Sequence, residues 1–332
     1  MAENDKNKLP RREFLARTAK AGLSIAGASV LAKLMYSSKT PSVQTDLSEM
    51  VKIPNFSITA GGAHQISIVK GADPAQSSLK AIDLLGGIER FVKPGETVVI
   101  KPNIAFASPP SLGATTNPQL VAQIVRLCYD RGKAKKVIVT DNPINNPQSC
   151  FLISGIGKAA SQAGAELLLP RPSFFQNTTL PGGRLINDWP IYYQALKNAD
   201  KLIGIAPLKD HRRSGASMTM KNFYGLLGGR RNVFHQDINT IIAELAMLFR
   251  PTLVILDGTV VMKTNGPTGG STSDLIRADT LIAGTDPVAV DSFGATLLDM
   301  KISDLQYLSL AKQAGVGTTD YMSLNPLYGA IS

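Results

Sequence analysis

The chain has 332 residues, of which 44% are hydrophobic and 18% are charged, as in an ordinary globular protein and unlike a disordered one. Its formal net charge is +10, but residues 1–39 hold eight Lys and Arg against three Asp and Glu, so half of the excess belongs to the start of the chain. The rest shows no basic stripe interleaved with aromatic residues and no nucleic-acid motif, so we expect no nucleic acid as a partner.

The two cysteines, Cys128 and Cys150, limit the redox chemistry that the chain supports by itself. Two thiols exclude a framework of several disulfides and a four-thiolate cluster, so we expect no iron–sulfur cluster held by this chain's own cysteines. A single disulfide remains open. Two buried thiols are the favoured reading, because Cys128 lies on an apolar helical pattern.

The first residues resemble a protein-export signal. Arg11 and Arg12 form a twin-arginine pair, which is followed by Phe14 and Leu15 and then by an apolar run rich in Ala, Gly and Ser. The pattern predicts a twin-arginine signal or anchor at residues 1–38. An amphipathic helix that happens to carry two arginines is the alternative.

Such a signal implies an address and a partner. We expect the twin-arginine export machinery to carry the folded protein to the periplasm or to the outer face of the cytoplasmic membrane. The apolar run is shorter than the roughly 20 residues that span a bilayer, so we expect membrane contact only through this segment, and only if it stays uncleaved.

Residues 39–64 contain prolines and no sustained period, which predicts a linker. Residues 65–332 alternate short β-branched runs with amphipathic stretches, which predicts one α/β domain: a mostly parallel sheet with helices on both faces. The expected strands cover 66–69, 97–100, 137–140, 166–169, 202–206, 253–256 and 280–283. The expected helices cover 74–85, 118–131, 151–163, 238–249, 287–298 and 303–314.

Polar residues follow five of these strands directly. They are Lys101, Asp141, Lys209, Asp257 and Asp286. The carboxyl ends of parallel strands meet at one edge of a sheet, so we expect these five side chains to lie along one edge and to face one crevice. For each aspartate, a plain turn is the alternative, whereas no turn requires a lysine.

The densest polar stretch follows the strand expected at 202–206. It holds Lys209 and His211, and then Lys221 and Asn222. Two lysines and a histidine so close in sequence repel one another, and burying them without a partner costs several kcal/mol or removes a proton. We therefore expect these four residues to form the core of a site for a small anionic ligand.

A glycine-rich stretch at 265–270 is the second feature of the expected site. Glycines allow backbone N–H groups to approach a ligand, so this loop is expected to cover or cradle the anion, with a flexible surface loop as the alternative. The expected substrate-binding residues are Lys101, Asn103, Lys221, Asn222, Gly266, Gly269 and Gly270. The expected catalytic residues are His211 as general acid or base, Lys209 and Asp257.

Metal chemistry is less clearly indicated. The candidate ligands are His211, His235, Asp257 and Asp286, and no two of them share a helical face at the spacing of a zinc motif. These residue types leave a divalent cation open as a cofactor. For His235, a position beside the start of the helix near residue 237 is the alternative.

A series of motifs in this order is similar to the domain-of-unknown-function family 362 (DUF362) over roughly residues 66–317. The motifs are V-I-K-P-N (99–103), T-T-N-P (115–118), A-P-L-K-D-H (206–211), T-M-K-N-F-Y-G-L-L-G (219–228), L-D-G (256–258), N-G-P-T-G-G (265–270) and G-T-D-P-V-A-V-D (284–291). The resemblance implies a single α/β domain. Some members of that family carry ferredoxin-type cysteine motifs, from which this chain departs because it has two cysteines and no C-x-x-C.

Three functions fit these observations. The first is an exported cell-envelope enzyme that acts on a small anionic substrate at the cationic site. The second is a non-catalytic ligand-binding or accessory protein that uses the same site. The third, a redox-associated component, rests on the resemblance to relatives with iron–sulfur clusters.

Overall fold

The computed structural model describes Arg12, residues 50–58 and residues 65–331. The chain divides into two compact units, Met1–Ser48 and Glu49–Ser332. Of the first unit only Arg12 is described, as an exposed helical residue, so Arg11, Phe14 and Leu15 of the expected export signal lie outside the described residues. No helix in the described part of the chain is long and apolar enough to cross a membrane.

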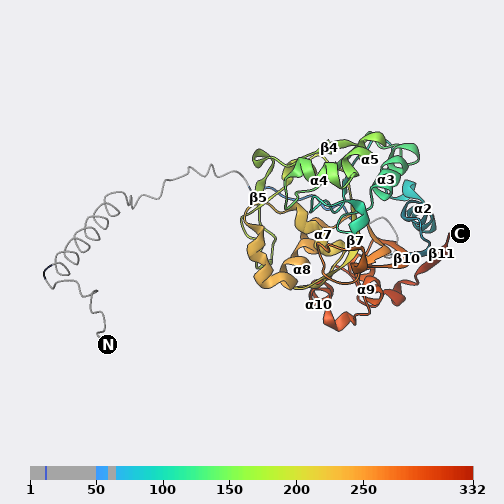
Figure 1. Ribbon diagram of the computed structural model, residues 1–332. Coiled ribbons are helices and arrows are strands. Elements are labelled where there is room, and N and C mark those ends of the chain that lie inside the picture. Colours follow the sequence, from blue (N-terminus) through green and yellow to red (C-terminus); the bar gives the residue numbers. More distant parts are fainter. Residues whose placement is uncertain (1–11, 13–49, 59–64, 332) are drawn as a thin grey trace, which may run out of the picture. The chain divides into compact units, whose positions relative to one another are not determined.

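A nine-stranded sheet forms the centre of the second unit (Figure 1). Eight strands follow the order β11-β1-β10-β9-β7-β2-β3-β4, and β8 pairs with the end of β7. Of the strands described, β10 and β8 run against the others. The strands are β1 (Ile66–Lys70), β2 (Thr97–Lys101), β3 (Lys136–Thr140), β4 (Glu166–Leu168), β7 (Lys201–His211), β8 (Gly215–Ser217), β9 (Leu253–Met262), β10 (Leu275–Gly284) and β11 (Leu327–Ala330).

Helices cover both faces of the sheet, which confirms the predicted α/β architecture (Figure 1). One apolar core lies under α2 (Pro74–Leu84), α3 (Pro118–Asp130), α4 (Pro147–Ile153) and α5 (Ile156–Gln162). The other lies under α7 (Thr219–Asn222), α8 (Ile238–Phe249), α9 (Pro287–Leu297) and α10 (Gln306–Gln313). Cys128 and Cys150 are buried free thiols in the first core, as the favoured reading predicts.

Helix caps account for several boundaries. Asn117 accepts a hydrogen bond from the backbone N–H of Gln119 and Asp286 accepts from that of Val288, and each precedes a proline at the first helical position. The single helix expected at 151–163 is instead two short helices, α4 and α5. Gly155, with φ of 71°, stands between them in the left-handed region, where glycine escapes the Cβ penalty.

The central strands are longer than predicted. β7 continues through Pro207 to His211, and β9 continues through Asp257 to Met262. Lys209 and His211 therefore belong to a strand and not to a loop, and β8 pairs antiparallel with this part of β7. Polar residues and a proline interrupt the apolar run at the end of β7, so hydropathy alone ends this strand too early.

The expectation that all five post-strand residues share one edge is wrong for Asp286. β10 runs antiparallel to β9, with Gly284 opposite Val254 at the beginning of β9. The end of β10, and Asp286 after it, therefore lie at the opposite edge from Lys101 and Lys209. Residues 263–274, between β9 and β10, contain no α-helix that would carry the chain back for a parallel pairing, and apolar periodicity does not reveal strand direction.

Two segments outside the main sheet pack against the domain. Residues 50–58, part of the expected linker, are anchored by a hydrogen bond from the Thr252 hydroxyl to the Phe56 carbonyl (2.7 Å) and by the buried ring of Phe56. Residues 170–191 contain a two-stranded sheet of β5 (Gln176–Thr178) and β6 (Trp189–Ile191). This small sheet packs beside the polar edge described next, since the Pro190 carbonyl accepts from the backbone N–H of Gly228 (2.8 Å).

Candidate functional site

A buried ion pair forms the floor of the candidate site. The ammonium of Lys101, the last residue of β2, lies 2.7 Å from the Asp141 carboxylate, and both side chains are almost fully buried. The same nitrogen donates to the Asn222 side-chain oxygen (2.9 Å) and to the Pro102 carbonyl (2.8 Å). All three donors of Lys101 are therefore used within the protein.

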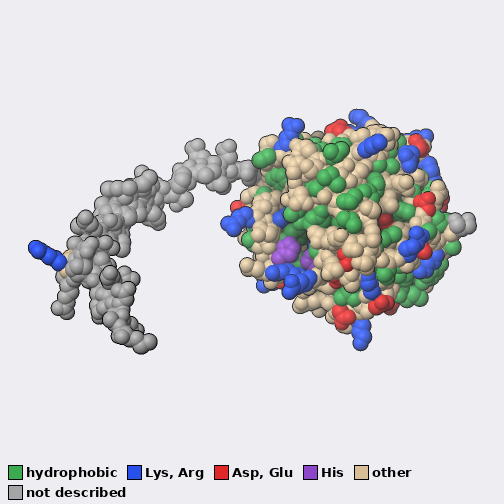
Figure 2. All heavy atoms as spheres, viewed as in Figure 1, with side chains coloured by type: hydrophobic (Ala, Val, Ile, Leu, Met, Phe, Trp, Pro, Cys, Tyr) green, Lys and Arg blue, Asp and Glu red, His purple; other side chains and the backbone are tan. Residues whose placement is uncertain are grey.

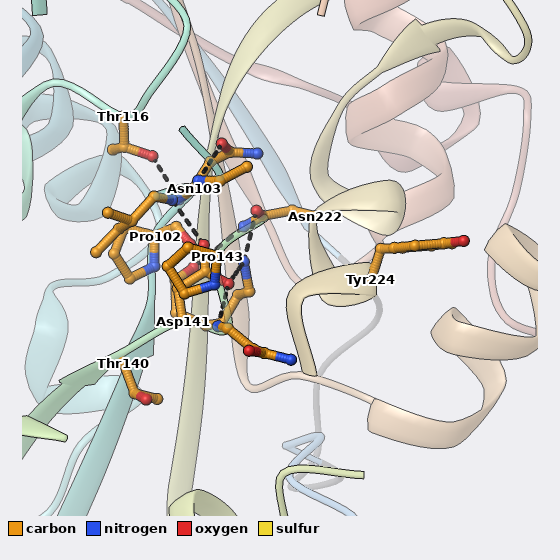
Figure 3. A network of polar contacts seen from close by, with 12 residues as sticks. Pro102, Asn103, Thr116, Thr140, Asp141, Pro143, Asn222 and Tyr224 are labelled. Atoms are coloured by element: carbon orange, nitrogen blue, oxygen red, sulfur yellow. Dashed lines mark hydrogen bonds and ion pairs between the residues drawn. The ribbon is translucent and has the colours of Figure 1, made fainter. Parts of the chain in front are cut away.

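The partners of Lys101 are equally committed (Figure 3). The Asp141 carboxylate also accepts from the backbone N–H groups of Ile104 (2.6 Å) and Asn142 (2.9 Å). The Asn222 amide donates to the carbonyls of Lys101 and Ile205, both at 3.1 Å. Lys101, Asp141 and Asn222, which we name the polar node, thus join β2, β7, α7 and the segment after β3. Figure 3 shows the ring of Tyr224 pointing away from this network.

Gly225 packs directly on the polar node. A Cβ at this position would stand 2.0 Å from the Asp141 carboxylate and 2.7 Å from the Lys101 ammonium. The Gly225 carbonyl also accepts from the backbone N–H of Asn142 (2.9 Å). The glycine that follows Tyr224 in the K-N-F-Y-G motif is therefore required by close approach of the backbone to a buried ion pair.

Above the polar node lies a cavity of about 90 Å³, which we name the lysine cavity. Figure 2 shows histidine side chains beside a group of Lys and Arg side chains on this face of the molecule. The residues that line the cavity are Lys101, Asn103, Ala105, Phe106, Asp141, Asn142, Ile144, Lys209, His211, Ser217, Lys221, Asn222, Tyr224, Gly225, Arg231, His235 and Pro267. Most of the residues expected to bind substrate therefore do meet in one place.

Lys209 is buried in the wall of the lysine cavity. Its ammonium donates to the Ala114 carbonyl (2.7 Å) and lies 5.4 Å from the centre of the Phe106 ring. Among the described residues it forms no ion pair with Asp or Glu. Burial, reinforced by the charges of Lys221 and Lys101, lowers the pKa of Lys209 to about 7.

Lys221 is the freest of the three lysines. It lies on α7, is half-buried, and sits 5.7 Å from the centre of the Tyr224 ring. In the part of the chain that the structure describes, its ammonium has no hydrogen bond and no carboxylate partner. Burial, followed by repulsion from Arg231 and Lys101, lowers the pKa of Lys221 to about 8.

His211 has one ring nitrogen committed to the protein. Its Nδ1 atom accepts from the backbone N–H groups of Arg213 (3.3 Å) and Ser214 (3.2 Å), so the neutral ring carries its proton on Nε2. Burial, followed by the charge of Lys221, lowers the pKa of His211 to about 3. At neutral pH His211 is therefore a hydrogen-bond donor to the cavity, and the expected general-base role does not fit this tautomer.

His235 presents the opposite tautomer. It lies on the 3₁₀ helix η5 (Arg231–Asp237), and its Nδ1 atom is 3.3 Å from the Asn232 carbonyl and 3.2 Å from the Tyr224 hydroxyl. The Tyr224 hydroxyl donates its one proton to the Arg231 carbonyl, so both neighbours of Nδ1 accept hydrogen bonds. The Nε2 atom of the neutral ring therefore carries a lone pair. Burial and then Lys221 lower the pKa of His235, and its ring stacks on that of His211 with 6.2 Å between centres. His235 does lie just before α8, as the alternative expected. It also lines the lysine cavity, which that alternative did not include.

Arg231 fixes the far side of the cavity. Its guanidinium donates to the carbonyls of Tyr224, Leu227, Asn142 and Pro143. These four bonds tie η5 to the segment after β3. The guanidinium also adds a positive charge to the cavity. Among the described residues, no Asp or Glu forms an ion pair with it.

The glycine-rich loop contributes less than expected. Of residues 265–270, Pro267 lines the lysine cavity. Gly266 is held by the Asp210 carboxylate, which accepts from its N–H (3.1 Å), and a Cβ there would meet the Asp210 carbonyl at 1.9 Å. Gly269 and Gly270 do not line the cavity. The glycines of this loop therefore allow its close packing against β7 and the backbone conformation of its turn.

Asp257 does not join the lysines. Its carboxylate accepts from the backbone N–H (3.0 Å) and hydroxyl (2.6 Å) of Thr259, and it lines a separate cavity of about 140 Å³ with Thr115. The structure therefore does not bring Asp257 together with His211 and Lys209, the other two residues expected to be catalytic. Loop 106–117 lies between the two cavities, since Ala114 faces Lys209 while Thr115 faces Asp257.

The four candidate metal ligands do not converge. His211 and His235 meet, but Asp257 lines the other cavity and Asp286 lies at the opposite edge, where it caps α9. Within residues 12, 50–58 and 65–331 no group of three or more His, Cys, Asp or Glu side chains surrounds one point.

Several residues of the site escape sequence reasoning. Asp141 was expected at the sheet edge but not as the partner of Lys101, and Phe106 and Arg231 were not expected in the site at all. The available signals were the double arginine at 230–231 after two glycines and the position of Tyr224 inside the K-N-F-Y-G motif. Neither signal specifies a partner, because the partners come from distant strands.

We predict that Gly225→Ala lowers the free energy of unfolding by about 2–4 kcal/mol, because the added methyl group separates a buried ion pair. Alanine is otherwise the better helix former, so a loss must come from this contact. Chemical denaturation measures it. The control is Gly270→Ala, whose methyl group would meet nothing within 4 Å and should change stability by less than ~0.5 kcal/mol. Equal stability of both variants would contradict the packing described.

We also predict a pH-dependent stability that Lys209 controls. Its pKa is about 7 in the folded protein against an ordinary 10.5, so the unfolded chain holds a proton that the folded protein releases between these values. The contribution of Lys209 to the free energy of unfolding therefore rises with pH across this range and is lost as the pH falls through 7.

The test compares urea unfolding of the wild type and Lys209→Met at a series of pH values. The variant should match or exceed wild-type stability near pH 7, and its advantage should shrink as the pH approaches about 10. Lys158→Met, at an exposed position of α5, serves as the control for loss of charge. A difference between wild type and Lys209→Met that stays constant with pH would show that the lysine titrates normally.

Comparisons with known proteins found one similar curated protein and similar solved structures. A thylakoid-associated protein of Synechocystis sp. is 26% identical over 258 residues, which cover 74% of each chain. The lactate racemase apoprotein from Thermoanaerobacterium thermosaccharolyticum aligns with 74% of this chain and 58% of its own, at 14% identity and a TM-score of 0.41. A Thermotoga maritima protein aligns with 74% of this chain and 60% of its own, at 12% identity and a TM-score of 0.36. Neither structural likeness carries an argument about function.

The family model described as Domain of unknown function (DUF362) matches residues 98–296, which include the polar node and every residue that lines the lysine cavity. The match spans more than half of the chain, and the protein therefore belongs to the DUF362 family.

Proposed function

We propose that this protein binds a small anion, a carboxylate or a phosphate, in the lysine cavity. The observation that carries the proposal is the uncompensated charge of Lys209 and Lys221. Lys101 is neutralised by Asp141, whereas the other two lysines have no carboxylate partner among the described residues. Charge that is buried without a partner is costly, and a bound anion would remove that cost.

Unused hydrogen-bond donors support the same proposal. In the described part of the chain, Lys209 uses one of its three donors and Lys221 uses none. The ring of His211 lines the cavity, and its Nε2–H has no acceptor among the same residues. An ion-pair network that only stabilises the fold would pair these groups, as it pairs Lys101. A volume of about 90 Å³ suits a small acid or an inorganic ion, since pockets for drug-sized ligands measure roughly 300–1,000 Å³.

We further propose that the protein acts in the cell envelope after export by the twin-arginine machinery. The support is the Arg11–Arg12 pair with Phe14, Leu15 and the apolar run after them. A relative whose name associates it with thylakoids is consistent with a place at a membrane.

We predict that sulfate and inorganic phosphate bind the full-length protein more weakly as the pH rises from about 6 to about 9. Over this range Lys209 and Lys221 lose their protons, with pKa values of about 7 and about 8. Sulfate keeps its charge throughout and so isolates the titration of the protein. Isothermal titration calorimetry measures the affinity, together with proton uptake in buffers of different ionisation enthalpy.

The same titration tests the site. Lys209→Met and Lys221→Met should each weaken sulfate binding by about tenfold or more, the loss of one charge-assisted hydrogen bond. Lys158→Met, which removes an equal charge from an exposed position, should bind as the wild type does. Unchanged affinity in both cavity variants would place the anion elsewhere and refute the proposal.

We predict that Arg11→Lys combined with Arg12→Lys retains the protein in the cytoplasm, because the twin-arginine pair is the recognised feature of the signal. Cell fractionation with an antibody against the protein measures the distribution. A matched substitution at Lys6 and Lys8, both to Arg, leaves the pair intact and should leave export unchanged. Normal export of the Arg11, Arg12 variant would refute the proposed route.

A further inference from the structure

Lys209 differs chemically from the lysine beside it. Lys101 gives all three donors to Asp141, Asn222 and Pro102, so a carboxylate compensates its charge. Lys209 has one carbonyl and one aromatic ring as neighbours and no carboxylate in the described part of the chain. A buried amine near other cations favours its neutral form, which is the nucleophilic form.

The cavity also provides a place for a carboxylate next to this amine. Lys221 lines the same cavity with three donors that have no partner in the described part of the chain. Asn103 lines it with a side-chain amide nitrogen that has no partner among the described residues. A substrate whose carboxylate binds these donors would bring its remaining atoms toward Lys209.

Two imidazole rings with opposite tautomers line this cavity, so one can donate a proton and the other can accept one. The Nε2 atom of His211 is a donor, since its Nδ1 atom accepts backbone N–H groups. The Nε2 atom of His235 is an acceptor, since its Nδ1 atom lies beside two groups that accept, the Asn232 carbonyl and the Tyr224 hydroxyl. Their rings stack, and both line the lysine cavity. Carbonyl addition needs one group that donates to the developing oxygen and one that removes a proton from nitrogen.

From this arrangement we propose that Lys209 is a covalent catalyst that forms an imine with a small oxo carboxylate. The inference rests on the proposed anion site and names the substrate class of that site. The carboxylate of the substrate binds Lys221 and the Asn103 amide nitrogen, its carbonyl oxygen accepts from His211, and its carbonyl carbon accepts the Lys209 amine.

The reaction balances without an oxidant or a reductant. The amine lone pair forms the N–C bond while the carbonyl π electrons move to oxygen, which accepts the hydrogen bond of His211. One proton leaves nitrogen through His235 and is delivered to that oxygen. The C–O bond then breaks as the nitrogen lone pair forms the C=N bond, and the oxygen leaves as water with the second amine proton. Protonation of the imine makes it an electron sink for bond cleavage at the neighbouring carbon.

The experiment is reductive trapping with the full-length protein. Pyruvate, a 2-oxo acid, or acetoacetate, a 3-oxo acid, is added with sodium cyanoborohydride, and peptide mass spectrometry locates the secondary amine that forms. We expect at least one of the two acids to modify Lys209, whereas acetone, which lacks the carboxylate, should leave it unmodified. The adduct is mapped in the wild type, so the result does not depend on a variant that fails to fold.

Variants separate carboxylate binding by Lys221 from imine formation by Lys209. Lys221→Met should reduce the fraction of Lys209 trapped at limiting pyruvate or acetoacetate by about tenfold, the loss of one charge-assisted hydrogen bond. Lys158→Met should be trapped as the wild type is. Modification spread over exposed lysines, or Lys209 unmodified by both acids, would overturn the proposal.

Sulfate binding distinguishes failure of the covalent role of Lys209 from failure of the anion site. If sulfate binds and Lys209 is not trapped, the anion site stands and the covalent role falls. If neither occurs, both proposals fall.

Discussion

The buried contact between Lys101 and Asp141 organises this edge of the sheet. Burying either charge alone would cost several kcal/mol of folding free energy. Each charged side chain can therefore be buried only together with the other and with further hydrogen-bond partners. Asn222 supplies one of those bonds and returns two more to the carbonyls of β2 and β7. The polar node therefore fixes where α7 begins and ends relative to the sheet, and with it the position of Lys221.

The node also explains an asymmetry among three neighbouring lysines. Asp141 lies within ion-pair distance of Lys101 and is fully occupied by it and by two backbone N–H groups. No carboxylate of the described chain remains for Lys209 and Lys221. Their lowered pKa values follow from burial and from mutual repulsion, and they are the physical basis of both the anion site and the covalent chemistry proposed for it.

A second contact, at the start of α7, also holds this helix in place. The Asp291 carboxylate, on α9, accepts from the backbone N–H groups of Thr219 (2.9 Å) and Met220 (3.1 Å), the first residues of α7. This short helix is thus held at its start by a carboxylate and at its end by Asn222. A four-residue helix is not stable alone, so the position of Lys221 depends on these two tertiary anchors.

Local sequence determined much of this protein: the alternation of strands and helices, the proline-marked caps at Asn117 and Asp286, and the arrival of Lys101, Asp141 and Lys209 at strand ends. These features depend on periodicity and capping, which neighbouring residues decide. Tertiary structure alone decided that β10 runs antiparallel and removes Asp286 from the site, and that loop 106–117 separates Asp257 from His211. It also decided which lysine is paired and which tautomer each histidine adopts. Those outcomes depend on the direction of strands and on contacts between residues far apart in the chain, and neither is encoded in the local spacing of residue types.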